Sequence, residues 1–144
     1  MRLSEEKGGY RITVFTAPTP FRAGLVDISV LVQDASTLEP VPGVRVNVQA
    51  APRGRPDESV GYPATAQAAT NKLFNAAVFE LPEAGWWDVQ VSVEGTRGPA
   101  RLRFEVEAAE RLPGWLALWP WIAWPCVVIL VFSVHQRLVR RRYR

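Results

Sequence analysis

One stretch near the C-terminus limits most strongly what this chain can fold into. Between Leu112 and Val134 there is no Asp, Glu, Lys or Arg. As a helix, the segment from Trp115 to Val134 would measure roughly 30 Å at ~1.5 Å per residue, which matches the hydrocarbon layer of a bilayer. A helix in a soluble core is usually shorter and keeps a polar stripe. The sequence therefore predicts one transmembrane helix over residues 115–136.

The two ends of this predicted span differ in chemistry. Its first half holds four tryptophans, whose rings favour the headgroup layer, together with Pro120 and Pro125, which should loosen or kink the helix. Arginines follow the second half at once, and positive residues beside a span mark its cytoplasmic side. The predicted membrane-interface anchors are Trp115, Trp119, Trp121, Trp124, Arg137, Arg140, Arg141 and Arg142.

This asymmetry predicts the sidedness of a single-pass protein. We expect the C-terminus in the cytoplasm and everything before Leu112 outside the bacterial cytoplasmic (inner) membrane, on its periplasmic side. The opening residues, MRLSEEKGGY, contain no apolar run of the kind a signal peptide needs. Three explanations stay open: a start further upstream, insertion after synthesis, or a domain that remains cytoplasmic.

The charge of the chain is distributed unevenly. Up to Arg111 there are 12 Lys and Arg against 14 Asp and Glu, so this part carries 12 − 14 = −2. The sequence pI of about 9.5 therefore comes from the arginine tail. A nucleic-acid-binding domain would carry a basic face of its own, so no nucleic-acid partner is expected.

Before Leu112 the apolar residues alternate with polar ones. This period of two is typical of antiparallel sheets with one face packed and one solvated. The clearest runs are residues 10–17, 25–34, 44–50, 86–93 and 100–107, with weaker strands expected at 64–69 and 75–81. About seven short strands separated by turns predict an all-β, immunoglobulin-like antiparallel sandwich.

The strand pattern also predicts how the chain is divided. We expect a flexible N-terminal segment, the sandwich, a linker, the transmembrane helix and a basic cytoplasmic tail. Their ranges are 1–9, 10–108, 109–114, 115–136 and 137–144. The longest irregular segment, residues 51–63, should be a surface loop.

Three segments of the sequence resemble those of a known family. TAPTPFRAGLVDISVLVQD, PVPGVRVNVQ and LPEAGWWDVQVSVEG are similar to the YtkA-like/FixH-like extracytoplasmic domains, a group that resembles the copper carrier CopC. The similarity covers roughly residues 10–108 and rests on turn and core positions such as Gly24, Gly85 and Trp87. It implies a sandwich fold and an accessory role around respiratory or metal-enzyme assembly.

The residues themselves do not point to catalysis or metal binding. Residues 1–111 contain no His and no Cys, and their only methionine is Met1, so soft metal ligands and a Ser–His pair are missing. The pairs Asp57/Glu58 and Glu105/Glu107 are explained by a loop and by a solvated strand face. No nucleotide motif occurs. We expect no cofactor, no catalytic residue and no small-molecule substrate.

One soluble segment, ATNKLFNAA, interrupts the strand pattern and is the candidate partner-docking site. Its candidate residues are Asn71, Lys72, Phe74 and Asn75. It can be a bend that crosses between sheets, with Asn satisfying backbone groups, or an edge that docks a partner. In the second case the apolar contact would be Phe74 or Phe79, whichever faces outward.

Together these features predict a membrane-anchored, non-catalytic accessory protein that binds or stabilises a membrane or periplasmic protein. Its partners would be the lipid bilayer and that protein. Two alternatives stay open. A periplasmic copper-handling metallochaperone would take up copper stoichiometrically. A permanent structural subunit of a larger membrane complex would be extracted with a fixed partner.

Overall fold

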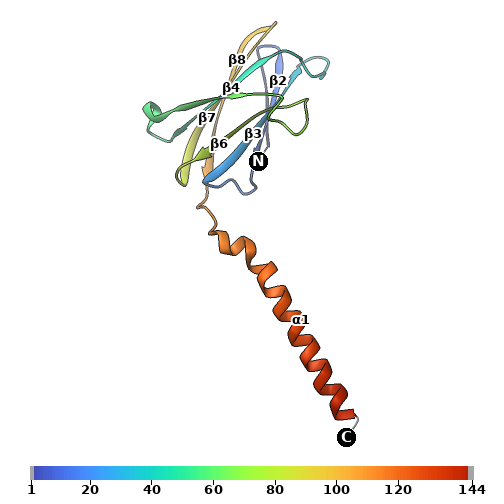
Figure 1. The fold of residues 1–144 in the computed structure, drawn as a ribbon. Coiled ribbons are helices and arrows are strands. Elements are labelled where there is room, and N and C mark those ends of the chain that lie inside the picture. The colour runs from blue at the N-terminus through green and yellow to red at the C-terminus, as the bar shows by residue number, and fades with distance from the viewer. Residues whose placement is uncertain (1, 143–144) are drawn as a thin grey trace. The chain divides into compact units, whose positions relative to one another are not determined.

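The structure is a computed structural model that describes residues 2–142, without the side chains at positions 2, 115–117, 122, 134 and 136–142 (Figure 1). It contains eight strands, one 3-10 turn and one helix. Their bounds are β1 Arg2–Lys7, β2 Tyr10–Ala17, β3 Gly24–Asp34, β4 Arg45–Pro52, η1 Pro56–Glu58, β5 Val60–Ala64, β6 Asn75–Leu81, β7 Gly85–Gly95, β8 Gly98–Ala108 and α1 Gly114–Arg142.

The strands form two antiparallel sheets that face each other across one core. One sheet has the order β1-β2-β3-β6 and the other has the order β5-β4-β7-β8 (Figure 1). The chain therefore changes sheet after β3, after β5 and again after β6. The predicted all-β architecture of antiparallel sheets is confirmed at this level, with eight strands in place of about seven.

The alternating residues predict the core correctly. Tyr10, Ile12 and Val14 on β2, and the valines with Ile28 on β3, are at most 2% exposed. Trp87, Val89, Val91 and Val93 on β7 are at most 4% exposed. These side chains form a single apolar cluster with residues of both sheets, so the two inner faces are buried against each other.

The N-terminal segment differs from the expectation of flexibility. Arg2–Lys7 forms β1, which pairs with β2 through a two-residue turn between Lys7 and Tyr10. Both turn residues, Gly8 and Gly9, have positive φ angles of 60° and 78°. This is the geometry of a tight hairpin turn that matches strand twist, and only glycine adopts it readily twice in succession.

The predicted loop at 51–63 and the weak strand at 64–69 are also placed differently. β4 continues to Pro52, η1 follows, and β5 already starts at Val60 and ends at Ala64. Pro63 obscured this strand in the sequence. It is tolerated because β5 lies at the edge of its sheet and pairs only with β4.

The first residues of the predicted linker 109–114 are held in place. Ala109 donates its backbone N–H to the Phe21 carbonyl and accepts from Ala23, both at 2.9 Å. Arg22 donates to the Glu110 carbonyl at 3.1 Å, and Arg111 pairs with Glu80. The chain is therefore fixed as far as Arg111, where the first of two compact units, Met1–Arg111, ends.

The second unit, Leu112–Arg144, contains α1. This helix runs from Gly114 to Arg142 with Pro120 and Pro125 inside it, so it continues past residue 136 into the predicted tail. Six consecutive apolar side chains, from Val127 to Phe132, are 52–65% exposed. Within the described part of the chain, no helix combines the length and the hydropathy of a membrane span, so the predicted transmembrane helix is not confirmed.

Gly95 at the end of β7 should not tolerate a side chain. A Cβ atom there would lie 2.7 Å from the Tyr10 hydroxyl and 2.9 Å from Val44 Cγ1, and Tyr10 is fully buried. We expect Gly95→Ala to destabilise the sandwich by about 1–3 kcal/mol, because the core cannot move aside.

Urea unfolding measures this effect, and Gly61→Ala is the matched control. The nearest atom to a Cβ at Gly61 lies at 3.7 Å, which is an ordinary contact. Equal stability losses in the two variants would show that the crowding at Gly95 is not real.

Candidate functional site

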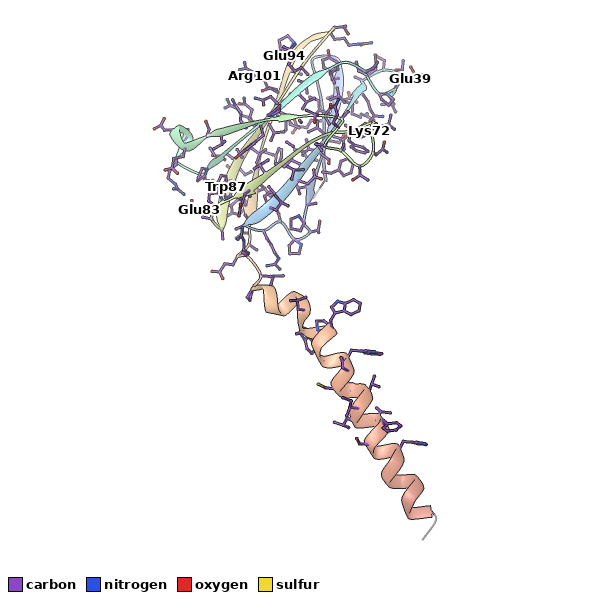
Figure 2. All side chains as sticks on the ribbon, viewed as in Figure 1. Glu39, Lys72, Glu83, Trp87, Glu94 and Arg101 are labelled. Carbon is purple, nitrogen blue, oxygen red and sulfur yellow. The ribbon has the colours of Figure 1, made fainter. Side chains whose placement is uncertain are left out.

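The predicted docking segment is a connection between the two sheets, from β5 to β6. Lys72 folds back over this connection, and its Nζ donates to the carbonyls of Ala66, Gln67 and Ala69 at 3.0, 3.3 and 3.2 Å (Figure 2). The Asn71 side-chain oxygen accepts the backbone N–H of Leu73 at 3.0 Å. Both polar side chains therefore satisfy local backbone groups, as the crossing interpretation expects.

The two candidate aromatic residues, Phe74 and Phe79, both contact other rings of the sandwich. Phe74 is half-buried and meets the Phe15 ring edge-on, with centroids 5.5 Å apart. Phe79 is 5% exposed and stacks on Tyr62 at 4.2 Å, so of the two candidate aromatic residues it is the one that faces inward. Asn75 begins β6, paired with Val30. Leu73, 56% exposed, is the apolar side chain that faces solvent here.

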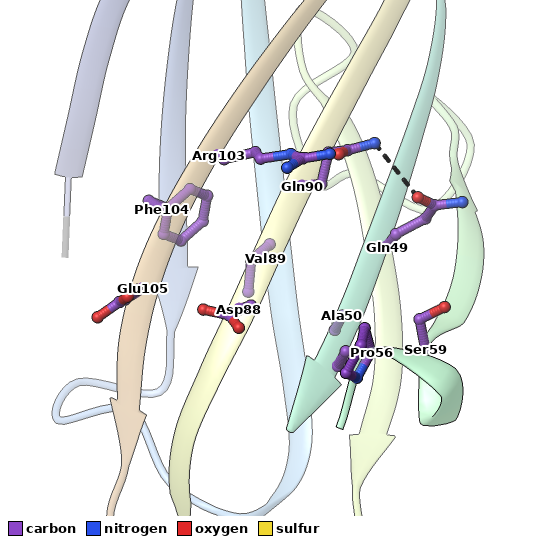
Figure 3. Close-up of a pocket in the computed structure, with 11 residues that line it drawn as sticks. Gln49, Ala50, Pro56, Ser59, Asp88, Val89, Gln90, Arg103, Phe104 and Glu105 are labelled. Atoms are coloured by element: carbon purple, nitrogen blue, oxygen red, sulfur yellow. Dashed lines mark hydrogen bonds between the residues drawn. The ribbon is translucent and has the colours of Figure 1, made fainter. Parts of the chain in front are cut away.

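A different site lies on the outer face of the β4-β7-β8 sheet. Register places Gln49, Gln90 and Arg103 in one row across the three strands. Arg103 Nε donates to Gln90 Oε1 at 2.6 Å, and Gln90 Nε2 donates to Gln49 Oε1 at 3.3 Å (Figure 3). This polar ladder is held in one orientation because each side chain fixes the next.

The next row along the strands is Ala51, Asp88 and Glu105. Ala51 is small where its outward neighbours on β4 are long, so the surface is hollowed at this row. We call the resulting cavity of about 560 Å³ the outer-face hollow; its wall on the β4 side is η1, with Pro56 and Ser59 (Figure 3). Asp88 and Glu105 lie on adjacent strands in this hollow, although like charges directly opposite each other destabilise a sheet.

Beyond the hollow the same face carries an exposed aromatic side chain. Trp86 precedes Trp87 on β7 and is 47% exposed, whereas Trp87 is buried. The Arg53 guanidinium lies 5.8 Å from the centroid of the Trp86 ring and 3.4 Å from Glu105. Cation–π and ionic contacts thus hold Arg53 beside the hollow.

The hydrogen-bonding groups of the hollow are only partly used. Asp88 and Ser59 make no side-chain hydrogen bond or ion pair within residues 2–142 as described. Two of the Arg103 nitrogens and the Gln49 amide nitrogen also remain available after the ladder is formed. The hollow therefore offers acceptors, donors and a hydroxyl within one cavity.

A second cavity, of about 460 Å³, lies between β5 and β6, which are edge strands of the two sheets. Its lining includes inner-face residues of both sheets, among them Phe79, Leu81 and Trp87. Arg55 pairs with both Glu58 and Glu83 at its rim. These three core side chains are at most 5% exposed, whereas Val60, which also lines the cavity, is 48% exposed.

The remaining predicted site residues lie on α1. Trp119, Trp121 and Trp124 are 55%, 79% and 69% exposed. The side chains of Trp115, Arg137, Arg140, Arg141 and Arg142 lie outside the description. In the part of the chain that is described, no group of three or more His, Cys, Asp or Glu side chains is placed to hold a metal ion.

One carboxylate has a perturbed pKa. Asp34 at the end of β3 accepts the backbone N–H groups of Ser36 at 2.7 Å and Thr37 at 3.2 Å, and these bonds hold its pKa below the ordinary value. Arg97, in the turn between β7 and β8, pairs with Asp34 and lowers the pKa further. The Arg97 backbone N–H donates to the buried Tyr10 hydroxyl at 2.9 Å. These contacts tie one end of the two sheets together.

The Asp34 contacts predict a pH-dependent stability. A folded-state pKa below the unfolded one contributes stability above the unfolded value, and this contribution is lost as the pH falls through the folded value. We expect Asp34→Asn to unfold at lower denaturant than the parent chain at pH 7, and this difference to disappear well below pH about 4.

Urea midpoints of Asp34→Asn and the parent chain, measured at pH 7 and again well below pH about 4, give the stability difference between the two chains. Glu94→Gln is the control, because Glu94 is exposed and its ion pair with Arg45 is 3.7 Å long. An Asp34→Asn deficit that persists unchanged in acid would contradict the assignment.

Comparison with known proteins gives no relative. No protein-family model matches the chain, and neither the curated proteins nor the solved structures contain a significant match.

Sequence reasoning missed the outer-face hollow because its residues were assigned to separate features. Asp88, Gln90 and Glu105 looked like parts of solvated strand faces, and residues 51–63, with Ala51, Pro56 and Ser59, looked like a loop. The usable signal was Ala51, a small outward residue between Gln49 and Arg53. Asp88 and Glu105 become neighbours only once the register of β7 and β8 is known.

Proposed function

We propose that this chain is a membrane-anchored, non-catalytic binding protein, in which α1 holds an immunoglobulin-like sandwich to a bilayer. The observation that carries this proposal is the unbroken exposure of apolar side chains from Val127 to Phe132. Six consecutive residues cover every side of a helix, so no single partner face would bury them all. The charge-free sequence from Leu112 to Val134 supports the same conclusion.

The proposed sidedness places the sandwich outside the bacterial cytoplasmic membrane. Its support is the arginine cluster that follows the apolar run. The resemblance of residues 10–108 to YtkA-like/FixH-like domains supports an accessory role beside a membrane complex, with respiratory or metal-enzyme assembly as the setting. The lipid bilayer and a membrane or periplasmic protein are its proposed partners.

A permanent subunit of a membrane complex is the second candidate. Pro120 and Pro125 lie inside α1, and each removes a backbone donor and disturbs a turn. Membrane helices with such prolines are stabilised when neighbouring helices satisfy the released carbonyls. Gentle detergent extraction distinguishes the two candidates: a fixed stoichiometric partner supports the subunit, and a clean monomer supports the anchored single chain.

Flotation with lipid vesicles tests the anchored function. The full chain should float with phosphatidylcholine–phosphatidylglycerol vesicles and resist alkaline carbonate. A chain that ends at Arg111, the boundary of the first compact unit, should stay in the soluble fraction. Equal flotation of the two chains would overturn the proposal, because the sandwich would then bind lipid itself.

A further inference from the structure

We propose that the outer-face hollow binds a neutral saccharide. This inference goes beyond the partners proposed above, the lipid bilayer and a membrane or periplasmic protein, and concerns a separate site on the sandwich. The cavity of about 560 Å³ lies within the range of roughly 300–1,000 Å³ that small-molecule sites occupy. It is large enough for one or two sugar rings, and it is open on the solvent side of the sheet.

The hydrogen-bonding groups fit vicinal hydroxyls. Each sugar hydroxyl both donates and accepts, so it is matched by carboxylate acceptors that lie close to amide and guanidinium donors. Asp88 and Glu105 supply the acceptors; Gln49 and Arg103 supply the donors. Gln90 fixes both donor side chains through its two bonds, which reduces the ordering cost of binding (Figure 3).

The charge balance favours a neutral ligand over an ionic one. On this face we count the outward residues of β4, β7 and β8 and also Arg53, which comes directly after β4. They include four arginines and four acidic residues. Their members are Arg45, Arg53, Arg101, Arg103, Asp88, Glu94, Glu105 and Glu107. A polyanion or a polycation would meet as much repulsion as attraction on such a face, whereas an uncharged polyol meets no net electrostatic repulsion.

Trp86 completes the argument. Its ring is 47% exposed on the same face, one outward position along β7 from Asp88. An indole presents a flat apolar surface on which the C–H face of a sugar ring can pack, while the hydroxyls reach the polar groups of the hollow.

Saturation-transfer NMR on the full chain in detergent micelles tests the inference. The probes are the tetrasaccharides of β-1,4-glucose, α-1,4-glucose and β-1,4-N-acetylglucosamine. We expect transfer to at least one of them, with a Kd in the range of about 0.1–1 mM, as for a site with a few hydrogen bonds and one stacked ring. No transfer to any of the three would overturn the inference.

Variants decide whether the hollow is responsible. Asp88→Ala and Trp86→Ala should each weaken binding at least tenfold, whereas Arg101→Ala, on the same face but outside the hollow, should leave it unchanged. Thermal melting checks that each variant is folded; since all three side chains are exposed, their stability should stay close to that of the parent chain. Equal binding by all three variants would contradict the site.

Two further results separate this inference from the proposed function. An oligolysine peptide that competes at the hollow more strongly than any saccharide would overturn the saccharide assignment. Vesicle flotation of the same preparations is read independently. Flotation without saccharide binding removes only this inference, and loss of flotation removes the membrane-anchored function itself.

Discussion

Replacing Ile129 by arginine should release the full chain from membranes. Ile129 is 64% exposed in the middle of the apolar run of α1. Near the centre of a span an isoleucine favours insertion by a few tenths of a kcal/mol, and an arginine opposes it by about 2.5–3.5 kcal/mol. The substitution should thus lower the membrane-bound to soluble ratio by roughly 100-fold or more.

Carbonate extraction of membranes from expressing cells measures this ratio, with Ile129→Leu as the matched control. The sandwich should be unaffected in both variants, because the members of its core cluster lie between Tyr10 and Ala108. An Ile129→Arg chain that stays in the membrane pellet as completely as the Ile129→Leu chain would contradict lipid burial of α1.

Replacing Trp87 by alanine should cost the sandwich about 3–5 kcal/mol of unfolding free energy, as for large aromatic residues in other cores. Trp87 is 4% exposed and lies in the cluster between the sheets. Its indole N–H donates to the Glu83 carbonyl at 3.3 Å, so the substitution removes a hydrogen bond as well as apolar contacts (Figure 2).

Trp86→Ala is the control for Trp87, since it removes the same side chain from the neighbouring, outward position. Its cost should not exceed about 1 kcal/mol, mainly from the cation–π contact with Arg53. Urea unfolding of a chain that ends at Arg111 gives both values. Similar losses in the two variants would mean that the inward and outward faces of β7 are assigned incorrectly.

The inner faces of the sheets could be predicted because period-two alternation records burial directly. The alternating residues of β3, β4 and β7 lie on one side of their strands, and the structure buries Val26 to Val32, Val46 and Val48, and Trp87 to Val93 at every second position as expected. The signal is physical: a polar side chain at an inward position would lose its hydration without replacement.

Two of the four edge strands, β1 and β5, could not be predicted in the same way, whereas the edge strands β6 and β8 could. β1 carries Glu5, Glu6 and Lys7, so it lacks the apolar pattern of a strand, and its pairing depends on the Gly8–Gly9 turn. β5 contains Pro63, which is compatible with a strand only at an edge. β1 and β5 bury few side chains, and their sequences therefore resemble loops.

The candidate sites illustrate the same limit. The polar interruption at Asn71 and Lys72 was visible, but its role depends on where the side chains point, and both point to local backbone groups. The outer-face hollow depends on which residues become cross-strand neighbours. Asp88 and Glu105 are far apart in the sequence, and register alone brings them together.

The central claim, that α1 is buried in lipid, is tested most directly at Cys126, the chain's single cysteine. This thiol lies within α1. Intact membranes are treated with a charged, membrane-impermeant maleimide before and after detergent is added; a charged reagent does not enter the hydrocarbon layer. Lipid burial predicts that labelling occurs only after the detergent. Labelling of Cys126 at the same rate in intact membranes would contradict it.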